Sequence, residues 1–141
     1  MSFSVQVTVD SANPHDLAGW WAETLGWQVE SQDEAFIRKM ISDGLATSAD
    51  TTEHRGALVW RDGAAIYPSN KDNGPRILFQ LVPESKISKN RLHLDIRTGD
   101  EDVKAVRERL VQRGAVVLYS SSQGPHSWVT LADPEGNEFC V

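Results

Sequence analysis

Apolar and polar residues alternate along several stretches of the chain, and this two-residue period predicts β-strands. The stretch 90–97 alternates strictly, with Leu92, Leu94 and Ile96 on one face and charged side chains on the other. The stretch 4–10 shows the same pattern with valines on one face. Shorter apolar stretches predict further strands at 27–30, 56–61, 64–67, 76–82, 115–119, 128–131 and 137–141.

Two stretches have the three- and four-residue apolar spacing of an amphipathic helix. The first begins at Asn13-Pro14, where asparagine suits the N-cap and proline suits the first helical position, and it ends at Gly26. The second begins at Gly99 or Asp100 and ends at Gly114. Between these two, the segment 33–45 predicts either a further helix or an irregular insertion.

Polar stretches predict the connections. Residues 48–55 and 120–125 lack apolar periodicity, and we interpret both as loops. The dipeptide Asp62-Gly63 separates two predicted strands and is typical of two-residue hairpin turns. We therefore predict that strands 56–61 and 64–67 pair with each other.

The predicted elements repeat in one order: strand, helix and three strands, then the same again. Module one covers about residues 1–83 and contains an insertion at 31–55, and module two covers about 90–141. Such a duplication predicts that each module buries its apolar face against its twin. With 141 residues, the chain is most simply a single α+β domain.

Composition narrows the range of partners. A net charge of -6 disfavours nucleic acid and anionic membrane surfaces. The apolar runs are too short for a transmembrane helix, and the first residues lack the basic and apolar parts of a signal peptide. A single cysteine, Cys140, excludes an intramolecular disulfide and fits a reducing compartment. We therefore expect a cytoplasmic protein whose partner is a small molecule.

Three segments carry motifs, at 10–27, 90–96 and 133–140. The first joins a strand end to a helix with a tryptophan pair and Leu-Gly, and the last is an Asp-Pro-Glu-Gly turn followed by apolar residues. In this order they resemble the vicinal oxygen chelate superfamily, in particular its glyoxalase-like and bleomycin-resistance-like branch. The resemblance implies two tandem βαβββ modules that form a curled mixed sheet around a cleft, with helices outside. Pairing of edge strands in a homodimer is compatible with that architecture.

Metal-dependent members of this superfamily take ligands from the first and last strands of each module. The resemblance places those positions at Gln6, Gln80, His93 and Cys140. Carboxylates usually stand where Gln80 and Cys140 stand, and two amides with one imidazole bind a divalent ion poorly. A thiolate at Cys140 favours zinc, whereas a buried Cys140 is a small hydrophobe.

Other side chains are candidates for ligand binding or proton transfer. Trp60 and Trp128 suit a pocket for a planar small molecule, although core packing explains them as well. Asp95 and Arg97, on the polar face of strand 90–97, are further ligand-binding candidates. A salt bridge between Arg97 and Asp10 is the favoured interpretation of Arg97, and its alternative is that Arg97 positions an anionic ligand. His93 is a candidate acid or base, but side chains two apart on a strand lie about 6–7 Å apart, so we do not expect it to contact Asp95.

Glu138 is the remaining candidate acid or base, and its alternative is a solvated glutamate at a strand edge. Lys86 and its charged neighbours are interpreted as a solvated linker between the modules. The missing carboxylate pair favours a protein that binds a small apolar or planar molecule without a cofactor. The alternative is a lyase, isomerase or dioxygenase that depends on zinc, nickel, cobalt or manganese. A metal-free enzyme using Glu138 or His93 is a third hypothesis.

Overall fold

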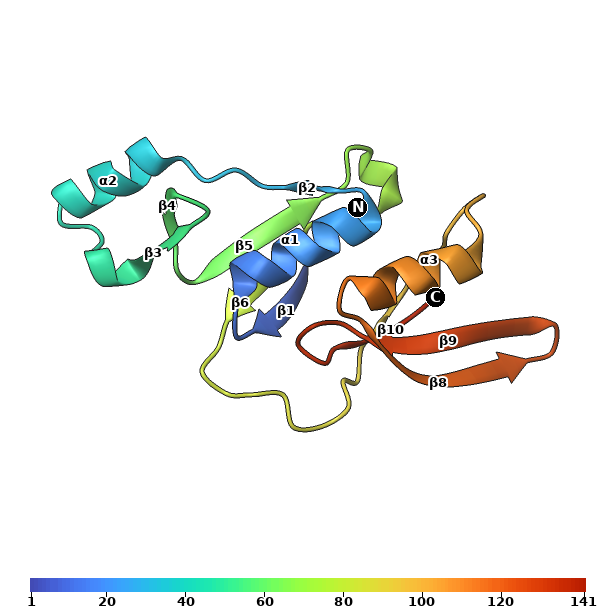
Figure 1. Cartoon of the computed structure of the whole chain (residues 1–141). Coiled ribbons are helices and arrows are strands. Elements are labelled where there is room, and N and C mark those ends of the chain that lie inside the picture. Colours follow the sequence, from blue (N-terminus) through green and yellow to red (C-terminus); the bar gives the residue numbers. More distant parts are fainter. The chain divides into compact units, whose positions relative to one another are not determined.

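The computed structural model describes residues 1–141 and confirms the α+β class (Figure 1). The chain forms two compact units, Met1–Glu84 and Ser85–Val141. No helix has the length and apolar character that a transmembrane helix requires. The elements of the first unit are β1 (Val7–Ser11), α1 (Pro14–Leu25), β2 (Gln28–Val29), α2 (Glu34–Ser42), η1 (Ser48–Asp50), β3 (Thr51–His54), β4 (Ala57–Trp60), β5 (Gly63–Tyr67), η2 (Lys71–Asn73) and β6 (Ile77–Leu81). Those of the second are β7 (Leu94–Asp95), α3 (Val103–Gln112), β8 (Val116–Gln123), β9 (His126–Ala132) and β10 (Glu138–Cys140).

The first unit is built on a four-stranded sheet in the order β1-β6-β5-β2. β1 and β6 run parallel, and the other neighbours are antiparallel. Helix α1 packs on β5 and β6, and its Leu17 and Trp21 are buried together with Ile66 and Phe79 of the sheet. Because alternate residues of a strand point to opposite faces, Leu78 and Gln80 of β6 lie on the face away from α1.

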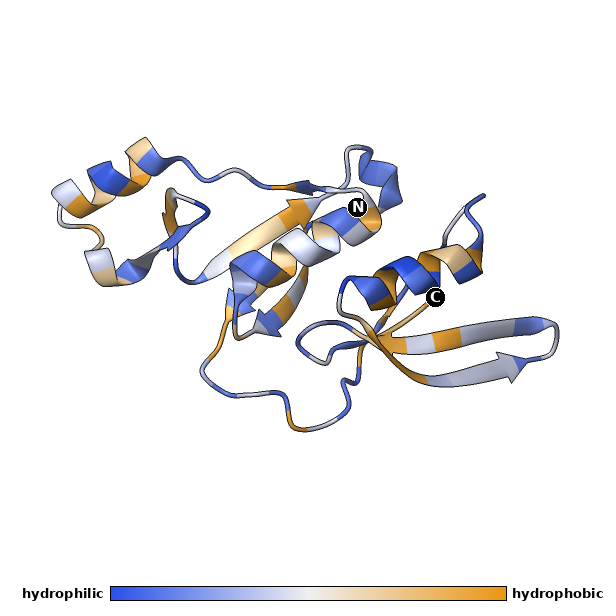
Figure 2. Ribbon diagram, in the orientation of Figure 1, coloured by the Kyte–Doolittle hydropathy of each residue, from blue (hydrophilic) through white to orange (hydrophobic).

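The second unit has a four-stranded sheet in the order β7-β10-β9-β8. Its first and last strands, β7 and β10, are again parallel neighbours. Val106 and Leu110 of α3 are buried, as are Leu131 and Phe139 of the sheet. In Figure 2, α1 and α3 both alternate between hydrophobic and hydrophilic bands, as amphipathic helices do. Each unit therefore places the ends of its first and last strands beside each other.

The predicted hairpin around Asp62-Gly63 is wrong. β4 pairs with β3 in a separate two-stranded sheet, and β5 pairs with β6 and β2 instead. The turn lies at Arg55 and Gly56, whose φ angles of 50° and 80° are those a type I′ turn requires, whereas Gly63 has no positive φ. The predicted loop 48–55 is therefore mostly η1 and β3. The insertion predicted at 31–55 continues beyond residue 55 to the end of β4.

Three further boundaries differ from the prediction. β8 continues through the predicted loop 120–125 as far as its turn with β9, because its serines complete an antiparallel ladder. The strand predicted at 90–97 is reduced to β7, and Leu92 is exposed. Helix α3 begins after Asp102, whose carboxylate accepts a hydrogen bond from the Ala105 N–H, rather than at Gly99 or Asp100. The N-cap at Asp102 therefore determines where α3 begins.

Two glycines of helix α1 should respond to alanine in opposite directions. Gly26 follows the helix with a φ of 66°. Gly26→Ala should therefore lower the free energy of unfolding by about 1–2 kcal/mol, even though no atom lies within 4 Å of the added methyl group. Gly19 lies inside α1, and no atom lies within 4 Å of a methyl group added there. Gly19→Ala should therefore raise the free energy of unfolding by about 0.5–1 kcal/mol. Urea unfolding of the two variants measures both effects, and equal effects would contradict the assigned C-cap.

Candidate metal and ligand sites

Three side chains with metal-binding atoms converge in the second unit. A ring nitrogen of His93, a carboxylate oxygen of Asp95 and Sγ of Cys140 all lie within 4.8 Å of one another. Parallel pairing of β7 with β10 places Asp95 directly opposite Cys140, and His93 immediately precedes β7. The His93 Nε2 and Asp95 Oδ1 atoms are 3.4 Å apart.

This contact corrects the expectation that His93 and Asp95 do not meet. The expectation assumed an extended strand through both residues, in which the two side chains stand parallel and apart. In the structure β7 contains only Leu94 and Asp95, so His93 lies outside regular strand geometry and its ring can turn toward the carboxylate. Asp95 therefore places a carboxylate beside His93 and Cys140, where the superfamily positions offered none in this unit.

Cys140 is held by a buried hydroxyl group. Thr130 of β9 lies opposite Cys140 in the antiparallel register, and its Oγ1 lies 3.4 Å from the Cys140 Sγ. Thr130 is only 3% exposed, so its hydroxyl has little access to competing water. This contact fixes the position of the Cys140 sulfur against β9.

The chemistry of these donors fits a divalent transition metal. Zinc binds sulfur, imidazole nitrogen and carboxylate oxygen at about 2.0–2.3 Å, which places tetrahedral ligands about 3.3–3.8 Å from one another. The 3.4 Å separation of His93 and Asp95 already has this value. Their side chains are 42% and 70% exposed, so a fourth position is open to a small ligand. The residues present therefore fit the kind of ion that the superfamily commonly uses.

The first unit does not bring Gln6 and Gln80 together. In the β1–β6 register Gln80 lies opposite Asp10, and Gln6 lies four residues earlier at the level of Arg76, about 13 Å along the strands. The Gln6 Oε1 accepts a 2.6 Å hydrogen bond from Arg76 Nη1. Arg76 also donates two 2.8 Å bonds to Glu30, and these bonds hold the pKa of Glu30 below its ordinary value.

An open groove of about 750 Å³ lies on the first unit. Two predicted site residues, Trp60 and Gln80, line it. Hydrogen bonds hold the backbone of Trp60 on both sides: its N–H donates to Gln32 Oε1 at 2.8 Å, and its carbonyl lies 2.7 Å from His15 Nε2. The other lining residues include apolar and charged side chains: Glu30, Ser31, Gln32, Asp33, Asp62, Gly63, Arg76, Leu78 and Leu81.

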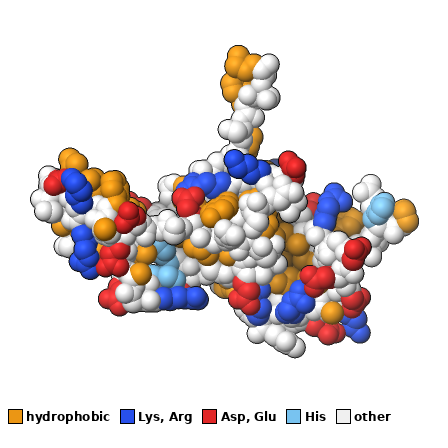
Figure 3. All heavy atoms as spheres, turned by 90° about the horizontal axis from the view of Figure 1, so that it is seen from above, with side chains coloured by type: hydrophobic (Ala, Val, Ile, Leu, Met, Phe, Trp, Pro, Cys, Tyr) orange, Lys and Arg blue, Asp and Glu red, His pale blue; other side chains and the backbone are white.

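The remaining predicted residues lie in the second unit. Trp128 is a partly buried residue of β9 opposite Ser121, and Arg97 is exposed beyond β7. Charged side chains of both signs are mixed over the face in Figure 3, and no basic patch is visible there.

Glu138 is not a solvated glutamate at a strand edge. Its side chain is only 11% exposed, and its two oxygens accept bonds from Lys86 Nζ at 2.9 Å and from the Asn90 N–H at 3.1 Å. Burial alone would raise the pKa of Glu138, but these hydrogen bonds outweigh burial and leave the pKa below its ordinary value. Lys86 is likewise bound to Glu138 rather than being part of a solvated linker.

Sequence reasoning missed Thr130, Asn90 and Asn137 as parts of this region. Thr130 carried no signal, because its role depends on the register between two strands. Asn137 directly follows the Asp-Pro-Glu-Gly turn. Asparagine at a turn often forms hydrogen bonds with nearby backbone, and this was the one signal in the sequence for its role. Its partner Asn90 is 47 residues away in the chain.

A sequence model of the glyoxalase-like domain matches residues 6–141, nearly the whole chain. The chain belongs to the glyoxalase-like family. This glyoxalase-like protein has the fold of the glyoxalase, bleomycin resistance and dioxygenase proteins of the vicinal oxygen chelate superfamily. A search of curated protein sequences gives no significant match.

Solved structures of similar fold share little sequence with this glyoxalase-like protein. A possible glyoxalase from Bacillus cereus is 13% identical with a TM-score of 0.59, covering 100% of this chain and 98% of its own. A glyoxalase/bleomycin resistance protein/dioxygenase from Alicyclobacillus acidocaldarius is 13% identical with a TM-score of 0.55, covering 99% and 89%. The oxidase ChaP-H2 is 11% identical with a TM-score of 0.60, covering 99% and 91%. At these identities the comparison establishes the fold alone.

Proposed function

We propose that this glyoxalase-like protein binds one divalent transition-metal ion, zinc in particular, through His93, Asp95 and Cys140, and presents it to a small-molecule ligand. The observation that carries the proposal is the convergence of three donor atoms of different elements within 4.8 Å. The sequence alone favoured a metal-free protein because it showed no carboxylate at the superfamily positions. Asp95 changes that balance because it lies beside both His93 and Cys140.

The donor set indicates which ion and which kind of site. Thiolate and imidazole together favour zinc over magnesium, calcium or manganese, which prefer oxygen ligands. Three protein ligands with an open fourth position are typical of catalytic zinc, whereas structural zinc is closed by four. A bound ion of this kind polarises an oxygen of its ligand or lowers the pKa of bound water. His93, Asp95 and Cys140 would hold the ion, and Thr130 would fix the position of the Cys140 sulfur.

Metal content tests the proposal directly. The protein, free of any affinity tag, is incubated separately with zinc, nickel, cobalt or manganese, desalted, and measured by mass spectrometry of the metals. We expect about one zinc ion per chain, similar or weaker retention of cobalt and nickel, and little manganese. A chain that retains none of the four ions would refute the metal site.

The groove of the first unit supports a second candidate function, the binding of a planar small molecule without metal. Trp60 lines the groove, and its backbone is hydrogen-bonded on both sides, so its indole offers an aromatic surface from an anchored position of the chain. Planar apolar compounds should then quench tryptophan fluorescence equally in metal-free and zinc-loaded protein. Trp60→Phe should lose most of the quenching, whereas Trp27→Phe, a matched change in the same unit, should keep it. Equal quenching of both variants would place the compound elsewhere.

A further inference from the structure

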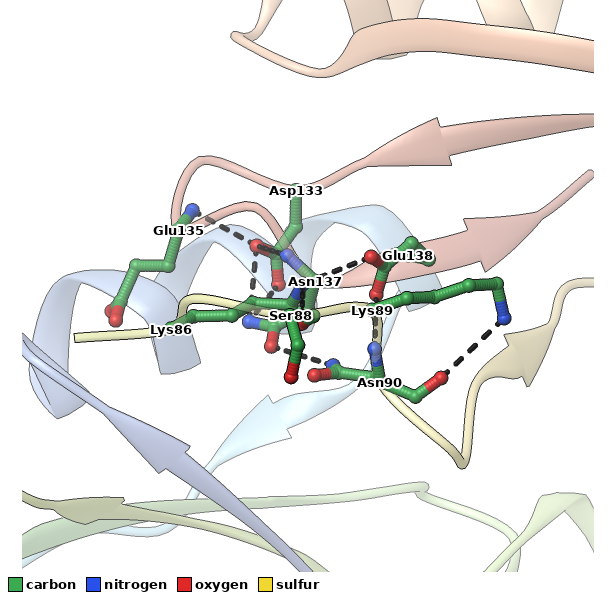
Figure 4. Close-up of polar contacts among 8 residues, drawn as sticks. All are labelled: Lys86, Ser88, Lys89, Asn90, Asp133, Glu135, Asn137 and Glu138. Atoms are coloured by element: carbon green, nitrogen blue, oxygen red, sulfur yellow. Dashed lines mark hydrogen bonds and ion pairs between the residues drawn. The ribbon is translucent and has the colours of Figure 1, made fainter. Parts of the chain in front are cut away.

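We propose that Glu138 is a positioning residue: it binds the segment 86–90 and thereby sets His93 beside Cys140. The inference rests on the proposed metal site for its functional meaning, but its structural content can be tested without metal. We call the segment 86–90 the clasp segment. Figure 4 shows Glu138 directed at this segment, with Asn137 beside it.

Two donors of the clasp segment occupy the two carboxylate oxygens of Glu138. Lys86 Nζ lies 2.9 Å from Oε1, and the backbone N–H of Asn90 donates to Oε2 at 3.1 Å. The same ammonium group donates to the Ser88 carbonyl at 2.7 Å, which closes the segment on itself. Charge-assisted bonds of this kind are about twice as strong as neutral ones. Because both oxygens are occupied, Glu138 is suited to hold the clasp segment rather than to take a proton from a substrate.

The turn before β10 provides a rigid base for this contact. Asp133 is buried, and its carboxylate accepts hydrogen bonds from the N–H groups of Glu135 and Asn137 at 2.9 and 3.0 Å. It also accepts from Asn137 Nδ2 at 3.0 and 3.1 Å. With its nitrogen directed at Asp133, Asn137 presents Oδ1 to Asn90 Nδ2 at 2.9 Å. The clasp segment is therefore bound by two neighbouring residues, Asn137 directly after this turn and Glu138 at the start of β10.

His93 needs such support because its own strand is short. β7 contributes only two residues to the sheet, and His93 precedes them. On one side of His93, β7 pairs with β10 through Leu94 and Asp95. On the other side, three residues away, Asn90 is bound to Glu138, which is two residues before Cys140 in β10. The same strand end thus carries one ligand of the cluster and fixes the segment that leads to another.

The test compares Glu138→Gln with Glu101→Gln, which breaks an exposed ion pair with Arg109 in the same unit. A glutamine at 138 has one acceptor oxygen for two donors, so one contact of the clasp segment must be lost. The first readout is hydrogen exchange of metal-free protein at the amides of Leu94 and Ile96, the latter of which donates to the Cys140 carbonyl at 2.8 Å. The second is zinc affinity in competition with a chromophoric chelator. Asn90→Ala removes only the bond to Asn137 and serves if Glu138→Gln folds poorly.

We expect Glu138→Gln to accelerate exchange at Leu94 and Ile96 and to weaken zinc binding by about 10–100-fold, the usual loss for groups that orient a metal ligand. Asn90→Ala should change both in the same direction, and Glu101→Gln should match the unchanged protein. Unchanged exchange in folded Glu138→Gln, or in Asn90→Ala where Glu138→Gln does not fold, would overturn the inference. If the unchanged protein binds no zinc while exchange still accelerates in Glu138→Gln, the metal proposal fails and the positioning role of Glu138 stands.

Discussion

His93→Ala is expected to lower the affinity for zinc by at least about 100-fold, because removing a ligand should cost more than the 10–100-fold lost when an orienting group is removed. His93 supplies the only imidazole of the cluster. Its replacement leaves Asp95 and Cys140 as a two-ligand set. Zinc titration in competition with a chromophoric chelator measures the loss.

Two further variants test the sulfur ligand and provide a control for the loss of a histidine. Cobalt bound to the unchanged protein should show thiolate-to-metal charge transfer, which Cys140→Ser should abolish even if some cobalt remains bound through oxygen. His126→Ala is the matched control, because His126 is an exposed histidine of the same unit outside the cluster. If His93→Ala and His126→Ala bound zinc equally well, His93 would not be a ligand.

Phe139→Ala is expected to destabilise the protein by about 3–5 kcal/mol, the usual cost of removing a fully buried phenylalanine side chain. Phe139 is 0% exposed and lies between Glu138 and Cys140 in β10, opposite Leu94 of β7 and Leu131 of β9. The lost side chain would leave a cavity at the pairing that brings β7 to β10. Zinc affinity should therefore fall together with stability.

Urea unfolding followed by circular dichroism measures this cost. Phe36→Ala provides the control, since Phe36 of α2 is 51% exposed and its replacement should change stability by no more than about 0.5 kcal/mol. Equal effects of the two replacements would mean that Phe139 does not form the core of its unit.

Local patterns in the sequence were sufficient wherever neighbours in the chain decide the structure. The tryptophan-bearing helix begins after Asn13 and ends at Gly26 as predicted, because proline at the first helical position and glycine with positive φ act within one turn. The order of strand, helix and strands was also visible, because apolar periodicity reports which residues face a core. The motifs at 10–27 and 133–140 indicated the family, which the match over 6–141 establishes.

Contacts between distant residues were decided by the tertiary structure alone. Asp62-Gly63 is a strong local signal for a hairpin, yet β4 pairs with β3, because the strand register and the turn at Arg55 and Gly56 determine the partner. The same holds for Glu138 and Lys86, which are 52 residues apart. Lys86 was interpreted as solvated, and a solvated position was the alternative to an acid or base role for Glu138. A charged residue looks the same in a sequence whether water or another side chain binds it.

The candidate metal cluster was likewise indicated partly by the sequence and partly by the tertiary structure. In the sequence, the resemblance to the superfamily pointed to His93 and Cys140 as metal-ligand positions, and alternation placed Asp95 on the same strand as His93. Only the tertiary structure brought the three side chains together. The β7–β10 register places Asp95 opposite Cys140, and because the chain before β7 is irregular, His93 can approach Asp95. Alternation along a strand specifies the face on which a side chain lies, whereas strand pairing and strand length decide which side chains meet.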